Sequence, residues 1–288
     1  MLIYWGFRAA AVLVRLLPLR VSYAVARTAG ILAYYAWRGG RRRCIQNMTH
    51  VTGGDRRAAR RHARASFGNY AVYLIDFVRL LGTRADEVTR RVQFDRWDEV
   101  QDLRTGDGLV IMTMHFGNWD IGAAMLARHV PVVAIADAFA NPRLNRLVMQ
   151  SREYLGMRVV PAGRTGPGLL RALRGNEVLA VLADVPAARG VEVEFFGATI
   201  AVSDGPARIA LRTGASVCAV AMPRLDRWRD IVRAELTAIP FEATGEQEVD
   251  VQRLTQAVFV CLERSVRRDP AQWYIFRHLW VADMPTAG

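Results

Sequence analysis

The chain of 288 residues contains no lysine, so arginine supplies all 39 of its basic side chains. Only 27 carboxylates oppose them, which leaves a formal net charge of +12 and an isoelectric point near 10.6. This excess predicts an acidic partner: nucleic acid, anionic lipid headgroups or an acidic carrier protein. Arginine suits bidentate phosphate contacts, but a GC-rich genome produces the same bias, so composition alone predicts no phosphate site.

Cysteine is scarce. The three cysteines, Cys44, Cys218 and Cys261, lie far apart in the chain and form no C-x-x-C pair. This spacing suggests neither a zinc site nor a disulfide framework. We therefore expect no metal centre and ordinary buried thiols in a reducing compartment.

The first 40 residues lack the roughly 20 uncharged positions that a membrane-spanning helix needs. Arg8 and Arg15 lie two helical turns apart, as do Arg20 and Arg27, with Pro18 between the pairs. Each pair falls on one face of a short amphipathic helix, as in a membrane-surface anchor. The alternative is a helical layer packed on the core. No small-residue cleavage site of a signal peptide follows.

Two basic clusters follow, at residues 38–43 and 56–64. Facing a bilayer, their arginines would meet lipid phosphates; nucleic-acid binding is the alternative. The aromatic residues sit in apolar segments instead of alternating with these clusters, and no zinc-finger or RNP-type pattern is present. The sequence thus favours membrane contact and no nucleic-acid partner, although a solvated helix face is the commonest fate of such runs.

No low-complexity linker divides the chain, so we expect residues 1–40 as a membrane-associating helical region and residues 41–288 as a single domain. Strand-like and helix-like segments alternate along that domain. This alternation predicts an α/β fold with a mostly parallel sheet flanked by helices. Strands are expected at residues 109–114, 132–136, 159–161, 178–183, 192–196, 217–222 and 231–236. Helices are expected at residues 119–128, 141–155, 168–174, 205–213 and 249–267, with a helical segment at 23–81.

The apolar run of residues 109–114 ends in His115, which would lie at the carboxyl end of a buried strand, where open α/β sheets bind ligands. Asn118 is a suitable N-cap for the next helix, and Asp120 falls in its first turn. With a tight turn, Asp120 can reach the Nδ1 side of His115 and leave Nε2 free to take a proton. The alternative is a structural histidine at a strand end.

A glycine-rich link, residues 163–168 with Arg164, joins a strand to a helix and could bind an anion. It is neither a P-loop nor a dinucleotide fingerprint, and as a plain turn it needs no ligand.

The segment His-Phe-Gly-Asn-Trp-Asp resembles the H-x-x-x-x-D/E box of the glycerolipid and lysophospholipid acyltransferase superfamily. It is most similar to the branch of late lipid A acyltransferases and phosphatidylinositol mannoside acyltransferases. Further similarities occur in family order. They are Arg152 four residues before a glycine, a strand ending in Asp184, a G-x-x-V-x-F-F-G hairpin from Gly190 followed by Ser203, and a P-x-Q-W segment at 270–273. Lipid A enzymes often carry Gln where this chain has Val185, which leaves the branch open.

The resemblance implies acyl transfer from a thioester, acyl-CoA or acyl carrier protein, to a lipid hydroxyl, with no other cofactor. His115 would be the general base and Asp120 would fix its tautomer. No G-x-S-x-G elbow is present, which agrees with direct attack without an acyl-enzyme. The backbone amides of Gly117 and Asn118 would stabilise the oxyanion.

The remaining roles follow from the same resemblance. Arg152 would bind a phosphate or another anionic group, while Asp184 and Glu192 would line the polar acceptor end or hold Arg152, and Ser203 would border the substrate. Related enzymes dock on the bilayer through their N-terminal region, which implies a peripheral or monotopic protein on the cytoplasmic face of a bacterial membrane. A lipid esterase or thioesterase that uses the same pair on water is the alternative, and a binding protein with a degenerate site is a third.

Overall fold

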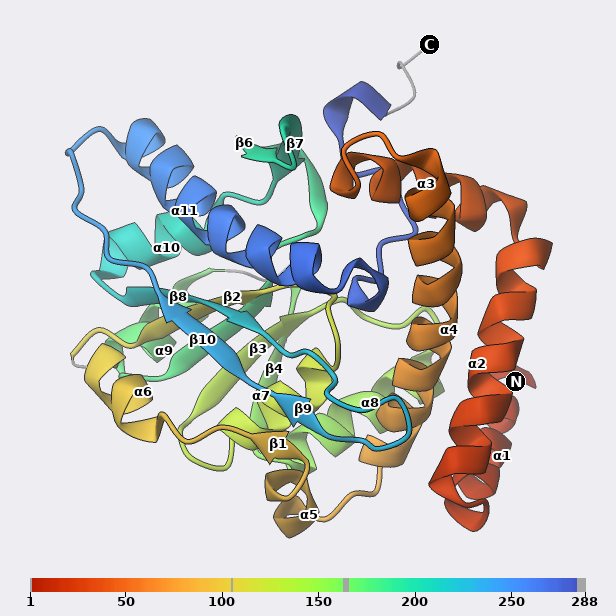
Figure 1. The fold of residues 1–288 in the computed structure, drawn as a ribbon. Helices are drawn as coiled ribbons and strands as arrows, with labels where there is room; N and C mark the ends of the chain where they lie inside the picture. The colour runs from red at the N-terminus through yellow and green to blue at the C-terminus, as the bar shows by residue number, and fades with distance from the viewer. Residues whose placement is uncertain (1, 105, 163–165, 284–288) are drawn as a thin grey trace.

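The computed structural model describes residues 2–104, 106–162 and 166–283, and it shows an α/β fold built on a six-stranded sheet (Figure 1). The strand order is β10-β8-β2-β5-β3-β4, in which β10 alone runs antiparallel to its neighbour. The predicted α/β fold with a mostly parallel sheet is therefore confirmed. The sheet strands are β2 (Leu109–Thr113), β3 (Val132–Ala136), β4 (Met157–Pro161), β5 (Val178–Leu182), β8 (Ser216–Ala221) and β10 (Glu235–Ala238).

Two small sheets accompany the central one. β1 (Val92–Gln93) pairs in parallel with β9 (Val232–Arg233), and β6 (Pro186–Phe195) forms a hairpin with β7 (Ala198–Val202). The strand expected at 231–236 is thus divided between β9, which pairs with β1, and β10, which pairs with β8. The segment is divided because its two parts pair with different strands. The periodicity of its sequence does not indicate this division.

The helices expected from the sequence are present, and two further short helices at residues 85–89 and 97–103 were not predicted. The α-helices are α1 (Leu2–Leu16), α2 (Leu19–Ala36), α3 (Arg38–Val51), α4 (Arg56–Leu80), α5 (Ala85–Thr89), α6 (Trp97–Leu103), α7 (Trp119–Leu126), α8 (Pro142–Tyr154), α9 (Pro167–Arg174), α10 (Gly205–Thr213) and α11 (Gln247–Arg268). Local signals set several boundaries. The Asn118 side chain accepts a hydrogen bond from the Ile121 amide at the start of α7, and Asn141 caps α8 in the same way.

Helices cover both faces of the sheet. On one face, alternate strand residues such as Val110 and Met112 pack with α9, α10 and α11 in the largest hydrophobic cluster. On the other face, Leu109 and Ile111 pack with α6 and the region of α7. Because successive side chains of a strand point to opposite faces, both faces are apolar. This explains why the strands read as continuous hydrophobic runs.

The N-terminal helices lie on the outer side of α4, against which α2 packs along its length (Figure 1). Pro18 interrupts the helical segment between α1 and α2, as expected. One face of α2 packs on α4 through Tyr23, Ala26, Gly30 and Tyr34. Gly30 permits the close approach, since a Cβ there would lie 2.4 Å from the Phe67 carbonyl oxygen.

The opposite face of α2 is apolar and exposed along one stripe. Its members are Val21, Val25, Leu32 and Tyr35, which are 45–63% exposed, and Trp37 follows at 49%. α1 adds the exposed side chains of Val12, Leu13 and Leu16. Among the helices described, none is long and apolar enough to cross a membrane.

Candidate functional site

His115 and Asp184 meet because they follow paired strands at the same offset. β2 and β5 are parallel neighbours in which Thr113 lies opposite Leu182, and each polar residue comes two positions later. The His115 Nδ1 lies 2.9 Å from Asp184 Oδ1, and the His115 amide donates to Asp184 Oδ2 at 3.0 Å. The imidazole therefore binds the carboxylate through Nδ1. Its other ring nitrogen, Nε2, takes no part in this contact.

Asp184 is nearly fully buried, with 1% of its side chain exposed. A third hydrogen bond reaches it from the indole N–H of Trp273, at 2.9 Å from Oδ2. Burial by itself raises the pKa of Asp184, but the charge of a protonated His115 and these hydrogen bonds outweigh that effect. The pKa of Asp184 is therefore below its ordinary value, and the carboxylate is held in its ionised form.

The expectation that Asp120 binds Nδ1 of His115 is wrong, because Asp184 occupies that position. Asp120 is buried at the start of α7, and its two carboxylate oxygens are engaged elsewhere. Oδ2 accepts from the Tyr73 hydroxyl at 2.6 Å, and Oδ1 accepts from the Arg152 guanidinium at 2.8 Å. The first turn of α7 directs this carboxylate toward Tyr73 of α4 and Arg152 of α8.

Arg152, expected to meet a substrate anion, is the ion-pair partner of Asp120, and only 14% of its side chain is exposed. Burial lowers the pKa of Arg152, but the neighbouring Asp120 carboxylate raises it by more, so the guanidinium stays charged. The same carboxylate adds to the effect of burial in raising the pKa of Tyr73. These three residues form a buried network beside the histidine.

The backbone amides expected to stabilise an oxyanion are already engaged. The Gly117 amide donates to the Gln272 carbonyl oxygen at 2.9 Å, and the Asn118 amide donates to the Met222 carbonyl oxygen at 3.0 Å. Gly117 has a φ of +64°, and a Cβ at this position would lie 1.8 Å from the Met222 oxygen. Gly117 and Asn118 thus shape the loop after β2, and the expected oxyanion role of their amides is wrong.

A cavity of about 1090 Å³ opens at His115. It is lined largely by apolar and aromatic side chains from α4, α9, α10 and the strand ends, and by the segment 274–278. Tyr73 stacks on Trp119 at 4.2 Å between ring centroids, and the Trp119 ring meets His115 edge to face at 5.0 Å. A cavity of this size and lining suits a large, mostly apolar ligand with a few polar groups.

The other sequence-predicted residues divide between this cavity and the surface. Asp120, Arg152 and Ser203 line the cavity with His115. Glu192 lies on the exposed side of the β6–β7 hairpin and is absent from the cavity lining, because its neighbours Val191 and Val193 take the inward positions. Arg164 lies outside the described residues.

Sequence reasoning missed Trp273 and Tyr73 as partners of the two buried carboxylates. The P-x-Q-W segment was a visible signal for Trp273, and in the structure its Phe116–Trp273 bridge ties this segment to the loop after β2. The Tyr274 amide donates to the His115 carbonyl oxygen at 2.8 Å. Tyr73 sits within a long helix, and nothing local to it indicated a polar contact.

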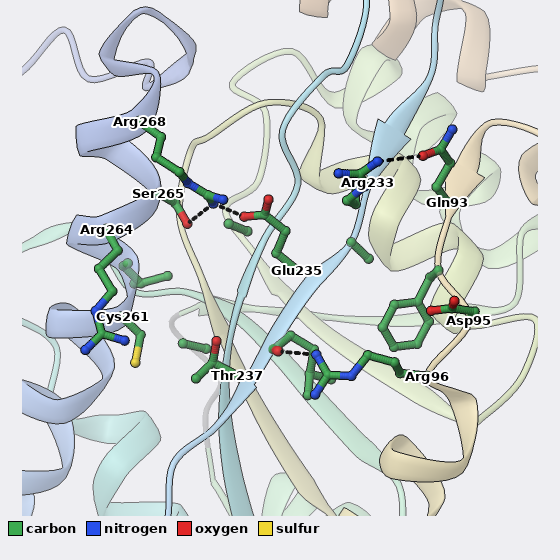
Figure 2. A pocket seen from close by; sticks show the side chains of 16 residues that line it. Gln93, Asp95, Arg96, Arg233, Glu235, Thr237, Cys261, Arg264, Ser265 and Arg268 are labelled. Carbon is green, nitrogen blue, oxygen red and sulfur yellow. Dashed lines mark hydrogen bonds and ion pairs between the residues drawn. The ribbon is translucent and has the colours of Figure 1, made fainter.

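A second cavity, of about 930 Å³, lies beside the edge strand β10 and contains none of the predicted site residues (Figure 2). Arg96 donates there to the Leu236 carbonyl oxygen at 2.9 Å, and Arg268 contacts Glu235. Among the described residues, no group of three or more His, Cys, Asp or Glu side chains is arranged to hold a metal ion.

Known proteins similar to this chain match it over almost its full length. A family model for bacterial lipid A biosynthesis acyltransferases matches residues 1–282. The phosphatidylinositol mannoside acyltransferase of Mycolicibacterium smegmatis is 29% identical over 289 residues, which cover 97% of this chain and 91% of that protein. The enzyme of the same name from Mycobacterium tuberculosis is 28% identical over 293 residues, covering 97% and 89%. These matches span both the helical N-terminus and the site at His115.

Proposed function

Because this chain belongs to the bacterial lipid A biosynthesis acyltransferase family, we propose that it moves a fatty acyl chain from a thioester donor to a hydroxyl of a glycolipid or phospholipid. Acyltransferase activity follows from the family; the donor, the acceptor and the catalytic groups are the proposal. The observation that carries it is the buried His115–Asp184 pair on the wall of a largely apolar cavity. The names of the two relatives make phosphatidylinositol mannosides the acceptors to test first.

His115 is the general base of the proposed reaction. Asp184 accepts the hydrogen bond from Nδ1 and so fixes the tautomer in which Nε2 carries a lone pair. Nε2 takes the proton of the acceptor hydroxyl as the oxygen attacks the thioester carbonyl carbon. The ionised Asp184 stabilises the imidazolium that forms.

The tetrahedral intermediate then collapses with cleavage of the carbon–sulfur bond. The thiolate leaves and takes the proton from Nε2, so that the imidazole returns to its starting form and an ester replaces the thioester. No acyl-enzyme is needed in this sequence. Since the amides of Gly117 and Asn118 are engaged, the oxyanion must meet other donors, and Arg152 and Ser203 carry N–H and O–H groups on the cavity wall.

The donor in this proposal is acyl-CoA or an acyl carrier protein. Both present a thioester on a phosphopantetheine arm, and the apolar part of the cavity suits the acyl chain. The basic surface of the protein suits an acidic carrier, and the phosphates of CoA as well. No metal ion is required by this chemistry.

We further propose that α1 and α2 dock the protein on the cytoplasmic face of the membrane without crossing it. The exposed stripe of α2 supports this, because such an apolar face is what an interfacial helix buries in a bilayer. The charge of the segment supports it too. Residues 1–54 contain eight arginines and no carboxylate, and Asp55 is the first acidic residue of the chain; anionic lipids attract such a segment.

Mass spectrometry of lipids tests the reaction. The purified protein is incubated with acyl-CoA or acyl carrier protein donors and a panel of phosphatidylinositol mannosides and lipid A precursors. We expect a new acylated lipid with the wild type and with His129→Ala, whose histidine stacks on Trp97 outside the cavity, and none with a folded His115→Ala. Free fatty acid formed regardless of acceptor would instead identify an esterase or thioesterase.

Vesicle co-sedimentation tests membrane docking. We expect the wild type to sediment with vesicles that contain phosphatidylglycerol, and Val25→Ser/Leu32→Ser to remain largely in the supernatant. Val260→Ser is the control, since Val260 is as exposed as Val21 but lies on α11. Equal sedimentation of all three proteins would contradict docking through α2.

A further inference from the structure

A cationic cluster borders the large cavity where α2 ends and α3 begins. Arg43 of α3 lines the cavity together with Trp37, Arg277 and His278. The Arg43 Nε donates to the Phe276 carbonyl oxygen at 2.8 Å, and its guanidinium carbon lies 5.8 Å from the centre of the Trp37 ring. Phe276 also packs against Trp37, with 6.1 Å between ring centroids. One continuous wall therefore carries an aromatic residue and three basic ones.

Arg43 and Arg277 differ from two other arginines of the cavity, Arg152 and Arg208, in having no carboxylate partner among the described residues. Arg212, which lines the cavity from α10, has none there either. Arg152 is paired with Asp120, and Arg208 is held by Asp204 and Glu248. Within the described part of the chain, neither Arg43 nor Arg277 forms an ion pair. Among the described residues, the carboxylates that line the cavity are Asp120 and Asp137.

Two further observations describe the surroundings of Arg277 and His278. Burial and Asp120 raise the pKa of Tyr70, which lines the cavity, and the charge of Arg277 opposes this rise. The Nδ1 atom of His278 is buried and has no hydrogen-bond partner among the described residues. The cluster thus carries positive charge that no carboxylate among the described residues neutralises by an ion pair.

The position of the cluster next to the exposed stripe of α2 indicates which anion it would bind. Trp37 is half-exposed and continues the apolar stripe of α2, so it lies at the level where a docked helix meets lipid headgroups. Arginine binds phosphate through paired N–H donors. A phosphate at this end of the cavity would sit at headgroup depth, with the headgroup hydroxyls directed toward the interior and His115.

From this arrangement we infer that Arg43, Arg277 and His278 form a seat for the phosphodiester of an anionic phospholipid acceptor. The seat orients a phosphoinositide-type headgroup that enters from the membrane side. This inference rests on the proposed function, because it assigns the acceptor side of that reaction. We therefore expect substitution of Arg43 and Arg277 to lower the affinity for the acceptor lipid and to leave the affinity for the acyl donor unchanged.

Isothermal titration calorimetry with two soluble probes tests the seat, dihexanoyl-phosphatidylinositol for the lipid and free CoA for the donor phosphates. In Arg43→Gln/Arg277→Gln, we expect lipid binding to weaken by about tenfold or more, since charge-assisted hydrogen bonds are lost, and CoA binding to be unchanged. Arg212→Gln is the matched control, because Arg212 lines the same cavity from α10 and also forms no ion pair among the described residues. It should bind both probes as the wild type does.

Three results would overturn the inference: unchanged lipid binding in the double variant, equal weakening in Arg212→Gln, or loss of CoA binding as large as that of the lipid. If loss of the Arg43–Phe276 hydrogen bond impairs folding of the double variant, lipid binding is measured with Arg277→Gln alone. Arg277 is exposed, so this single substitution should leave folding intact. The measurement requires no turnover. Lipid binding that depends on Arg277 in a protein without acyl-transfer activity would therefore support the seat while contradicting the proposed reaction.

Discussion

The imidazole of His115 binds Asp184, a residue 69 positions away, through a hydrogen bond of 2.9 Å between Nδ1 and Oδ1. The register of β2 and β5 produces this contact, because Thr113 and Leu182 are paired and each polar residue follows two positions later. Asp120, only five positions from the histidine, serves a different network with Tyr73 and Arg152. The two buried carboxylates of the site therefore have separable roles, and substitutions should separate them.

Asp184→Asn should reduce kcat by about two to four orders of magnitude, because an amide cannot stabilise the imidazolium and can hold the wrong tautomer. Asp120→Asn should instead reduce thermal stability, since it weakens the contact to Arg152. The kcat and the melting temperature of both variants test this assignment. An Asp184→Asn enzyme with wild-type kcat would show that the pair is not catalytic.

Most of the strands and helices could be predicted because their signals are local, whereas the short elements β1, β7, α5 and α6 were not predicted. Short apolar runs marked the strands around residues 109–113 and 178–182, and Asn118 and Asn141 marked helix starts by their capping side chains. The position of His115 at a strand end followed from the same signals. The resemblance to a known family added Asp184 to the site, although with a different role.

The partner of His115 could not be predicted in this way. It depends on β2 lying next to β5, two strands that are not consecutive in the chain. Reasoning along the chain therefore selected Asp120, the nearest carboxylate after the histidine. The same limit explains the error at Gly117 and Asn118, whose amides are taken by carbonyl oxygens of Gln272 and Met222, both distant in the sequence.

Trp273→Phe should lower kcat roughly tenfold or more, because the indole N–H that holds Asp184 Oδ2 is lost. Trp280→Phe is the matched control. Trp280 is equally buried, and its indole N–H donates to the Phe195 carbonyl oxygen at 3.0 Å, away from the site. It should therefore lower stability and leave kcat nearly unchanged.

A positioning role for Trp273 also requires that its effect pass through Asp184. In an Asp184→Asn background, Trp273→Phe should cost little further activity, because the carboxylate that it holds is gone. The pH dependence of kcat should shift in Trp273→Phe alone. Additive losses in the double variant, with an unchanged pH profile, would indicate a purely structural tryptophan.

Arg152→Met should destabilise the protein by about 3–5 kcal/mol, because it leaves the Asp120 carboxylate buried without a counter-charge. Tyr73→Phe should cost less, about 1–2 kcal/mol, since it removes one hydrogen bond from the same carboxylate. Urea unfolding measures both. In Asp120→Asn/Arg152→Met the combined loss should be smaller than the sum of the single losses, and strict additivity would contradict the network.

The lowered pKa of Asp184 predicts a specific dependence of stability on pH. A carboxyl whose pKa is lower in the folded than in the unfolded protein stabilises the fold above the unfolded value and loses that contribution as pH falls through the folded value. The stability advantage of the wild type over Asp184→Asn should thus be full at neutral pH and shrink below pH 3.8. Urea unfolding across this range tests the sign, and an advantage that grows in acid would contradict it.

Gly117→Ala should abolish most activity, because the new methyl group would collide with the Met222 carbonyl oxygen and move the loop that carries His115. Gly197→Ala separates this collision from backbone strain. Gly197 also has a positive φ, +72°, but a Cβ there would meet nothing within 4 Å. It should cost about 1–2 kcal/mol of stability from the left-handed backbone alone and keep kcat. If both variants lost stability equally and both retained activity, close packing at Gly117 would have no part in positioning His115.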